Sequence, residues 1–200
     1  EGALLDNIHQ EAVDNVKRLR NHACIALWCG NNECQDAWLG WGWKCEIERQ
    51  NKEYADKIWA QYRQQYHVTL PGVVREYAPG TFYWTSSPFA FEGEMSGTTD
   101  GDRHYWSVWH GKAPISDYDS EKSRFFSEYG FQSFPEFDSV KRYAPYPEDW
   151  DIRSEVMLSH QRGGDHANGL IENYLLNEYK KPRDFRAFLY MNNVLKGTAI

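Results

Sequence analysis

Apolar residues at the start of the chain recur every three or four positions. They are Leu5, Ile8, Ala12, Val16 and Leu19. This spacing predicts an amphipathic helix that ends near Asn21 and His22. The continuous apolar run over residues 23–29 (ACIALWC) is typical of a parallel strand buried on both faces. The strand is expected to stop at the polar turn of residues 30–32.

The alternation of helix and strand continues through the middle of the chain. Residues 46–66 predict a second helix, with charges on one side. Its apolar side is formed by Ile47, Tyr54, Ile58, Trp59 and Tyr62. Val73 and Val74 are predicted to lie near a helix end. Residues 81–84 predict a second short strand, and a loop begins directly after it.

That loop, residues 86–102, is long and rich in Gly, Ser, Thr and Asp. Long loops in compact domains are usually functional or disordered. Two further segments have the composition of strands. One is the aromatic segment 104–110 (HYWSVWH), and the other is the short segment 124–127 (RFFS), which leads into Glu128.

The chain after Pro135 is predicted to be helical and polar. Helices are expected near residues 151–160, 168–179 and 182–195. Pro182 can occupy a first helical turn and Gly197 can end the last helix, because proline fits the start of a helix and glycine its end.

Strands that alternate with helices predict a parallel sheet, either open and doubly wound or closed into a barrel. No glycine-rich phosphate-binding fingerprint follows any predicted strand, which argues against the nucleotide-binding, doubly wound version. The predicted fold class is therefore α/β, as part of a (β/α)8 TIM barrel with four of its strands and their helices. A complete barrel needs about 250 residues, so residues 1–200 are expected to be a fragment of a barrel domain with a helical portion from about residue 150.

Composition narrows the kinds of partner. The net charge of −7 argues against nucleic acid, because nucleic-acid surfaces normally show a basic stripe. The apolar runs are too short to span a bilayer, and no signal-peptide pattern opens the chain. Aromatic residues make up 16 % of the chain, including nine tryptophans. Such rings suit stacking on a sugar, although they also serve partner interfaces.

The four cysteines, Cys24, Cys29, Cys34 and Cys45, lie close together in the sequence. They lack the paired spacing of a zinc or redox site, so no metal is predicted. Cys24 and Cys29 fall in an apolar run and are expected to be small buried hydrophobes. A disulfide between Cys34 and Cys45 stays open, as does the compartment, with a periplasmic or secreted location favoured over a cytoplasmic one.

Two glutamates follow short apolar strands, and this placement has a chemical meaning. Active sites of (β/α)8 barrels are built at the carboxyl ends of the strands, so Glu33 and Glu128 are expected at that face. Retaining glycosidases use two carboxyl groups about 5 to 5.5 Å apart. The alternative is that both are ordinary exposed loop residues. Asn31 and Asn32 before Glu33 supply amides that can bind a sugar hydroxyl, or can simply form a turn.

Two segments carry a specific resemblance. Residues 22–33 (HACIALWCGNNE) and 124–135 (RFFSEYGFQSFP) resemble the acid/base and nucleophile motifs of glycoside hydrolase family 2, in its β-mannosidase branch. The Ser86-Ser87-Pro88 and Gly101-Asp102-Arg103-His104 segments are similar to that branch too. Cys34 follows the first glutamate where galactosidases and glucuronidases usually have Pro or Ser. Ala23 and Cys29 depart from the common Pro and Ser, and these changes do not touch the chemistry.

The resemblance implies an enzyme that removes terminal β-mannose by double displacement. Glu128 would form a glycosyl-enzyme intermediate, while Glu33 would protonate the leaving group and then activate water. It also implies that residues 1–200 belong to a catalytic barrel domain and need the rest of a longer polypeptide, with the missing strands and β-sandwich domains. No cofactor is implied. A related family 2 glycosidase, or a carbohydrate-binding relic without turnover, is the alternative.

Six residues are candidates for sugar contacts: Asn32, Trp41, His104, Trp106, Trp109 and His110. Trp41 lies in a loop of Gly and Trp (WLGWGW), where it could stack on a sugar or pack on the barrel rim. The other aromatic and histidine candidates come from one predicted strand end. Alternate strand residues point apart, so Trp106 shares a face with His104 and Trp109 does not. His104 could contact a sugar hydroxyl or a glutamate.

Overall fold

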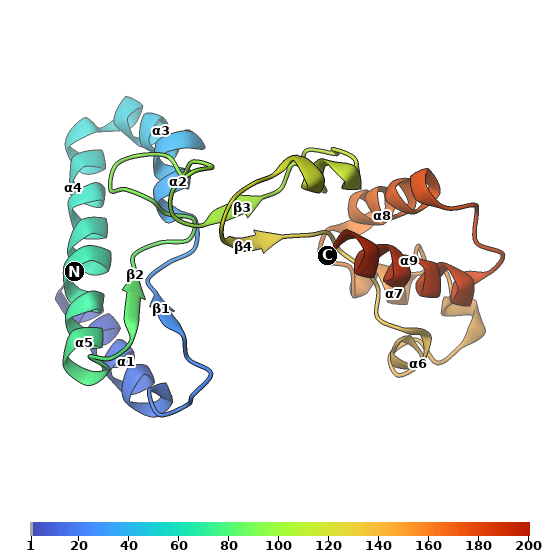
Figure 1. Ribbon diagram of the computed structural model, residues 1–200, viewed down its shortest axis with the longest axis horizontal. Coiled ribbons are helices and arrows are strands. Elements are labelled where there is room, and N and C mark those ends of the chain that lie inside the picture. The colour runs from blue at the N-terminus through green and yellow to red at the C-terminus, as the bar shows by residue number, and fades with distance from the viewer. Residues whose placement is uncertain (1) are drawn as a thin grey trace. The chain divides into compact units, whose positions relative to one another are not determined.

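The structure is a computed structural model that describes residues 2–200. Contacts divide the chain into two units (Figure 1). The first comprises the chain up to His104 together with Lys122–Ser127, and the second comprises Tyr105–Glu121 and Glu128–Ile200. Within residues 2–200, no helix is long and apolar enough to cross a membrane.

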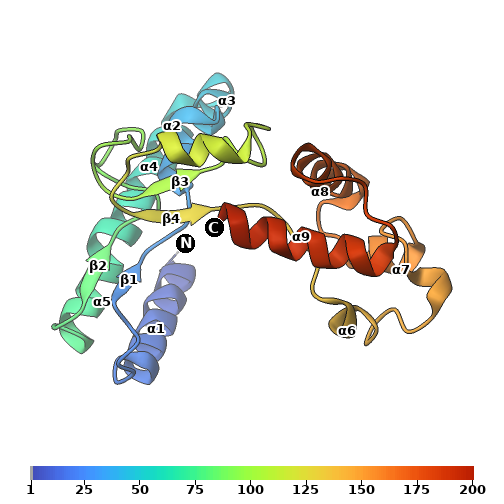
Figure 2. The same cartoon turned by 45° about the vertical axis from the view of Figure 1, so that its right-hand side comes forward.

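The core of the first unit lies between two helices and a pair of strands. Helix α1 (Gly2–Leu19) packs on helix α5 (Leu70–Tyr77), and Figures 1 and 2 show both beside strands β1 (Leu27–Cys29) and β2 (Phe82–Trp84). The buried side chains are Val13, Val16, Val73, Val74 and Ala78, with Trp28 and Tyr83 packed against them. The helical spacing of the first segment therefore predicted the face that forms this core.

Strands β1 and β2 are parallel, with Leu27 opposite Phe82 and Cys29 opposite Trp84. The parallel pairing inferred from the sequence is confirmed. The expected burial on both faces is wrong for the described residues, because the helices cover only one face. On the other face Leu27 is 38 % and Phe82 60 % exposed. These residues line an open apolar concavity of about 670 Å³.

The open face explains why two of the cysteines are exposed. Cys24 and Cys29 line the concavity and are exposed, so the prediction that they are buried is wrong. All four cysteines are free thiols. The disulfide between Cys34 and Cys45 that the sequence left open is therefore absent from the described residues.

The single helix predicted over residues 46–66 is in fact two helices, followed by a π-helical segment. After the short helix α2 (Cys34–Gly40), helix α3 (Trp43–Gln50) ends at Asn51, whose side chain accepts the Tyr54 N–H and starts helix α4 (Lys52–Arg63). A π-helical segment (Gln64–Thr69) then joins α4 directly to α5. The apolar spacing does not show this break, since the N-cap asparagine interrupts the backbone without interrupting the pattern.

Strands β3 (Arg103–Tyr105) and β4 (Phe126–Tyr129) form a second two-stranded sheet and run across the boundary between the units. The Arg103 N–H donates to the Phe125 carbonyl at 2.9 Å. The strand predicted over residues 104–110 ends at residue 105, and a 3-10 helix covers Ile115–Ser120. The strand predicted before Glu128 is present and includes that residue.

The second unit is mainly helical. Its helices are α6 (Phe137–Val140), a 3-10 turn (Pro147–Asp149), α7 (Glu155–Ser159), α8 (Gly164–Glu178) and α9 (Phe185–Ala199). Fully buried apolar side chains form its core: Met157, Ile171, Leu175, Leu189 and Leu195. The three predicted helices exist with shifted bounds. Asp184, rather than Pro182, starts α9 by accepting the Ala187 N–H, and Gly197 lies inside that helix.

Candidate active site

Glu33 lies where strand β1 gives way to helix α2. Its backbone N–H donates to the Ser87 carbonyl at 2.7 Å, and its carbonyl accepts the Ala37 N–H at the first helical turn. Between these bonds the backbone has a left-handed φ of 59°. Non-glycine residues rarely adopt this region, and those that do cluster at functional sites. The two bonds therefore hold Glu33 in a conformation that its residue type does not favour.

Asn31 ties the ends of the two strands together. Its Nδ2 donates to the Thr85 carbonyl at 3.0 Å, and its Oδ1 accepts the Ser86 hydroxyl at 2.8 Å and the Cys34 N–H at 3.1 Å. These bonds favour the turn-forming alternative for Asn31. Asn32 forms a backbone bridge with Ser87 and is exposed, so a sugar contact by its side chain stays a prediction.

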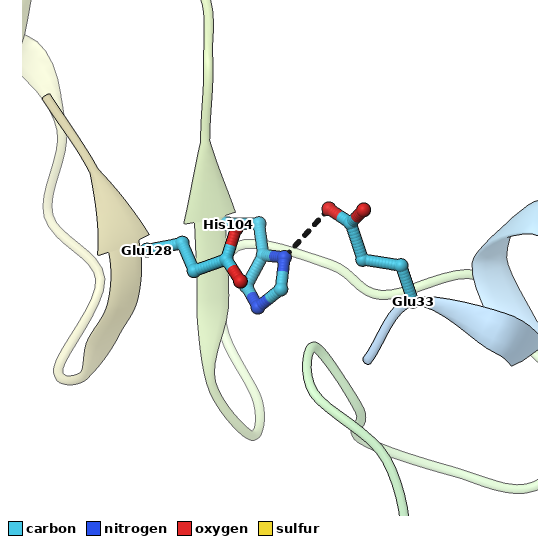
Figure 3. A group of neighbouring side chains, drawn as sticks. All are labelled: Glu33, His104 and Glu128. Carbon is cyan, nitrogen blue, oxygen red and sulfur yellow. Dashed lines mark hydrogen bonds and ion pairs between the residues drawn. The ribbon is translucent and has the colours of Figure 1, made fainter. Parts of the chain in front are cut away.

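The carboxyl group of Glu33 contacts a buried histidine. Its Oε1 lies 2.7 Å from Nδ1 of His104, which strand β3 carries (Figure 3). The His104 side chain is only 4 % exposed, whereas that of Glu33 is 22 % exposed. Glu33 is thus the member of the pair that solvent or a ligand can reach.

The other ring nitrogen of His104 faces a second polar group. Nε2 lies 2.9 Å from the Ser87 hydroxyl oxygen, and that hydroxyl lies 2.5 Å from Oδ2 of Asp102. A chain of hydrogen bonds therefore runs from Glu33 through His104 and Ser87 to Asp102. All four residues belong to the first unit.

Asp102 is buried and accepts four hydrogen bonds. The donors are the hydroxyls of Ser87 and Ser127, the indole N–H of Trp84 and the backbone N–H of Phe89. Burial alone would raise the pKa of the Asp102 carboxyl, but these hydrogen bonds outweigh it and hold that pKa below the ordinary value of 3.8. Asp102 is consequently a carboxylate at neutral pH.

Glu128 belongs to the second unit, and its side chain is half-buried. It projects from strand β4 (Figure 3), directly after Ser127, whose hydroxyl binds Asp102. Gly130 follows two residues later with a φ of 113°, and its N–H donates to the Tyr118 hydroxyl at 3.0 Å. Strand and turn therefore fix the backbone on both sides of Glu128.

The aromatic candidates differ in exposure. Trp109 is only 5 % exposed, stacks at 20° on Phe131 and Tyr174, and donates its backbone N–H to the Tyr174 hydroxyl. This packing leaves little of its ring for a sugar. His110 is exposed and lies edge-on to the half-buried Trp106 at 5.4 Å. Both stay candidates, in the second unit.

Trp41 ends helix α2 in the first unit. Its side chain is 55 % exposed, and the ring of Trp43 meets it edge-on at a centroid distance of 6.2 Å. The exposed ring is available for stacking, so the predicted sugar contact stays a prediction.

Comparison with known proteins gives a consistent result. The chain is 34 % identical over 195 residues to Beta-mannosidase B of Aspergillus clavatus and 32 % identical to that of Aspergillus niger. A crystal structure of Beta-D-Mannosidase from Dictyoglomus thermophilum superposes on all of this chain with a TM-score of 0.78 and 27 % identity. The chain is similar to β-mannosidases. No family model matches it.

The match covers nearly all of this chain but only a small part of each relative. The alignment covers 97 % of this chain but only 23 % of either fungal β-mannosidase, and the Dictyoglomus structure is also covered to 23 %. The chain therefore spans about a quarter of the length of the curated relatives that it matches. The mixed helix-and-strand fold described above is shared with part of a β-mannosidase.

Sequence reasoning missed the roles of Ser87, Asp102 and Ser127. The first two appeared only inside segments that resemble the β-mannosidase branch. No local signal indicated them, because Ser87 follows β2, Asp102 precedes β3, and these two strands belong to different sheets. Glu33 and His104 are residue types that bind metals, but their facing atoms share a direct hydrogen bond. The absence of a metal or cofactor stays a prediction.

Replacing Asp102 with alanine is expected to destabilise the first unit. The change leaves the indole N–H of Trp84 and the backbone N–H of Phe89 without their acceptor, and each such group costs about 1–3 kcal/mol. We therefore expect the variant of the full-length protein to have a lower thermal midpoint than the wild type when both are measured at about pH 6. Asp100→Ala, which alters an exposed carboxylate in the same loop, should leave the midpoint unchanged.

The pH dependence of this effect has a definite sign. Because folding lowers the pKa of Asp102, its stabilisation is complete above 3.8 and disappears as the pH falls through the lower folded-state value. The difference in midpoint between wild type and Asp102→Ala should therefore shrink below pH 3.8. A difference that stays constant there would show that the Asp102 carboxylate does not provide the stabilisation.

Proposed function

We propose that the chain is part of the catalytic (β/α)8 barrel, about strands 4 to 7, of a retaining exo-β-mannosidase of glycoside hydrolase family 2. The observation that carries the proposal is the identity of 34 % to a β-mannosidase over 97 % of the chain. The chain works within a longer polypeptide, since it matches only 23 % of that relative. A periplasmic or secreted location is part of the proposal.

The arrangement of the first unit supports a barrel. Strands β1 and β2 are parallel, each follows a helix, and α1 and α5 cover one face of the pair. In a (β/α)8 barrel the helices form the outer ring and apolar side chains fill the interior. The uncovered face, with its concavity of about 670 Å³, has the apolar lining expected of such an interior. Further strands of the longer polypeptide are the proposed partners of this face.

The proposed reaction runs in two steps. The carboxylate of Glu128 attacks the anomeric carbon while Glu33 gives its proton to the leaving oxygen, so one carbon–oxygen bond forms as another breaks. Glu33 then removes a proton from water, which attacks the same carbon and releases Glu128. Both steps invert that carbon, and the product keeps the β configuration.

The exposure of the sugar-binding candidates supports assigning them different roles. Asn32 and Trp41 in the first unit, and His110 in the second, are exposed and available to a sugar. Trp106 is half-buried beside His110, and Trp109 is buried. We assign the stacking role to Trp41 and hydrogen bonds with sugar hydroxyls to Asn32 and His110, with Trp106 and Trp109 supporting His110.

Hydrolysis of a panel of 4-nitrophenyl β-glycosides by the full-length protein tests the proposal. We expect β-mannoside to be cleaved in preference to β-galactoside, β-glucuronide and β-glucosaminide, and NMR to detect β-mannose before mutarotation. Release of mannose alone from a mannooligosaccharide would support exo action. Preference for another sugar would point to a related family 2 glycosidase, and sugar binding without turnover to a carbohydrate-binding relic.

A further inference from the structure

The loop over residues 106–113, which follows strand β3 in the second unit, has a strained backbone. Trp109 and Lys112 have left-handed φ values of 81° and 60°, in a region that residues other than glycine rarely adopt. Within residues 2–200, Glu33 is the only other residue besides glycines with a positive φ. Backbone strain of this kind persists only where the surrounding structure holds the chain in place. The loop therefore needs a group that holds it.

The hydroxyl group of Tyr174, on helix α8, holds the strained part of this loop at both ends. It accepts the backbone N–H of Trp109 and donates its proton to the Ala113 carbonyl, each at 2.8 Å. A tyrosine hydroxyl can donate one hydrogen bond and also accept, so both of its capacities are used here. Tyr174 is only 6 % exposed, and a buried backbone group that loses its partner is costly. One side chain of α8 thus closes the segment from Trp109 to Ala113.

His110 lies inside the closed segment and is exposed to solvent. Its ring meets two indole rings edge-on, that of Trp106 at a centroid distance of 5.4 Å and that of Trp109 at 6.4 Å. A shift of the backbone at Trp109 would move His110 and one of the rings that contact it. The position of the His110 imidazole therefore depends on the backbone that Tyr174 holds.

We propose that Tyr174 is a positioning residue, whose hydroxyl fixes His110 for a hydrogen bond with a hydroxyl group of the terminal sugar. The inference rests on the proposed function, in which His110 binds that sugar. Tyr174 is buried, so it acts through the loop and not by touching the sugar. The proposal gives helix α8, from the helical portion of the chain, a part in substrate binding.

The ring of Tyr174 has a separate packing role, which allows the hydroxyl to be tested alone. The ring stacks on Trp109 at 20° and on Phe131 at 13°. Phe131 follows Glu128 by three residues, so this stacking also supports the segment after the proposed nucleophile. Tyr174→Phe keeps the ring and removes only the hydroxyl. The Trp109 N–H then lacks its acceptor, and the loop is expected to relax and displace His110.

The measurement is the inhibition constant of mannose against hydrolysis of 4-nitrophenyl β-mannoside by the full-length protein. Only folded molecules contribute to this constant, so a loss of folded protein does not change it. We expect His110→Ala to raise it about 10-fold and Tyr174→Phe about 5-fold, the range for a hydrogen bond between uncharged groups. In a protein that already carries His110→Ala, Tyr174→Phe should change it less than about 2-fold, because residues that act through one contact are not additive.

A second variant opens the same loop without altering Tyr174, and it serves if Tyr174→Phe does not fold. In Gly111→Ala the new Cβ would lie 2.6 Å from the Ser107 carbonyl oxygen, so the backbone must shift. We expect the inhibition constant to rise here too, and only when His110 is present. Tyr190→Phe is the matched control, since Tyr190 of α9 is 69 % exposed, and it should leave the constant unchanged.

The outcomes separate the inference from the proposed function. If the wild type cleaves β-mannoside but Tyr174→Phe has no effect, or the same effect with and without His110, the inference is wrong and the proposed function stands. If His110→Ala leaves the constant unchanged, His110 does not bind the sugar and the inference fails, whereas the roles of Glu33 and Glu128 are unaffected. If the folded wild type cleaves no glycoside, the proposed function fails and the inference fails with it.

Discussion

Replacing Glu128, the proposed nucleophile, with alanine is expected to lower kcat of the full-length protein on 2,4-dinitrophenyl β-mannoside by at least about 10⁴-fold, the size of loss seen when a catalytic nucleophile is removed. The reason is that, in the proposed reaction, Glu128 supplies the group that attacks the anomeric carbon from the face opposite the leaving group. A good leaving group does not help, because the missing group acts on the carbon and not on the leaving oxygen. Steady-state release of dinitrophenolate measures the loss.

A trapping experiment tests the same assignment without a variant. In a 2-fluoro β-mannosyl fluoride, the fluorine at C2 destabilises both transition states, while the fluoride at C1 is a good leaving group. The first step therefore still proceeds, the second is slow, and the glycosyl-enzyme should accumulate. We expect peptide mass spectrometry to find the label on Glu128. Glu155→Ala, which removes an exposed glutamate from α7 in the same unit, is the matched control and should keep wild-type activity. Substantial turnover by Glu128→Ala, or a label on another residue, would remove Glu128 from the nucleophile role.

The sequence predicted most of the elements that position these residues. The three- and four-residue spacing of the first segment identified the face of α1 that packs on α5. The apolar runs before Gly30 and before Ser86 identified β1 and β2, and the helix before each run indicated that they are parallel. These features depend on local patterns, which sequence periodicity records directly.

Burial could not be predicted in the same way. The run over residues 23–29 is apolar on both faces, yet only the side of Trp28 is packed among the described residues, and Leu27 is 38 % exposed. An apolar run shows that a strand is suited to burial on both faces and does not say which segment provides the cover. At Leu27 and Phe82 the apolar sequence pattern predicts burial, whereas the described residues leave these side chains lining an open concavity.

The candidate site was predictable only in part. Glu33 could be found because it directly follows a strand, and its left-handed backbone sets it apart again in the structure. The link between His104 and Asp102 could not, because it passes through Ser87, fifteen or more positions away in the sequence. Such contacts depend on the path of the loop over residues 86–102, which composition does not determine.

Replacing Glu33 with alanine is expected to separate the two steps of the reaction. Dinitrophenolate leaves without an acid, so the first step survives, but the second loses its base and slows by about 10²–10⁴-fold, the usual contribution of general base catalysis. The intermediate should then accumulate, and a burst of dinitrophenolate should precede slow turnover. The change should not unfold α2, because the Glu33 side chain makes no capping hydrogen bond there.

Azide then distinguishes the two glutamates. It is a small nucleophile that needs no base, and it fits the space that the lost carboxyl leaves, so it should attack the accumulated intermediate of Glu33→Ala and give β-mannosyl azide. In Glu33→Gln the glutamine side chain fills that space, so azide should restore less activity to this variant than to Glu33→Ala. In Glu128→Ala, azide can act only in place of the missing nucleophile and would give the α-anomer. The anomer of the azide product therefore assigns the roles, and an α-azide from Glu33→Ala would exchange them.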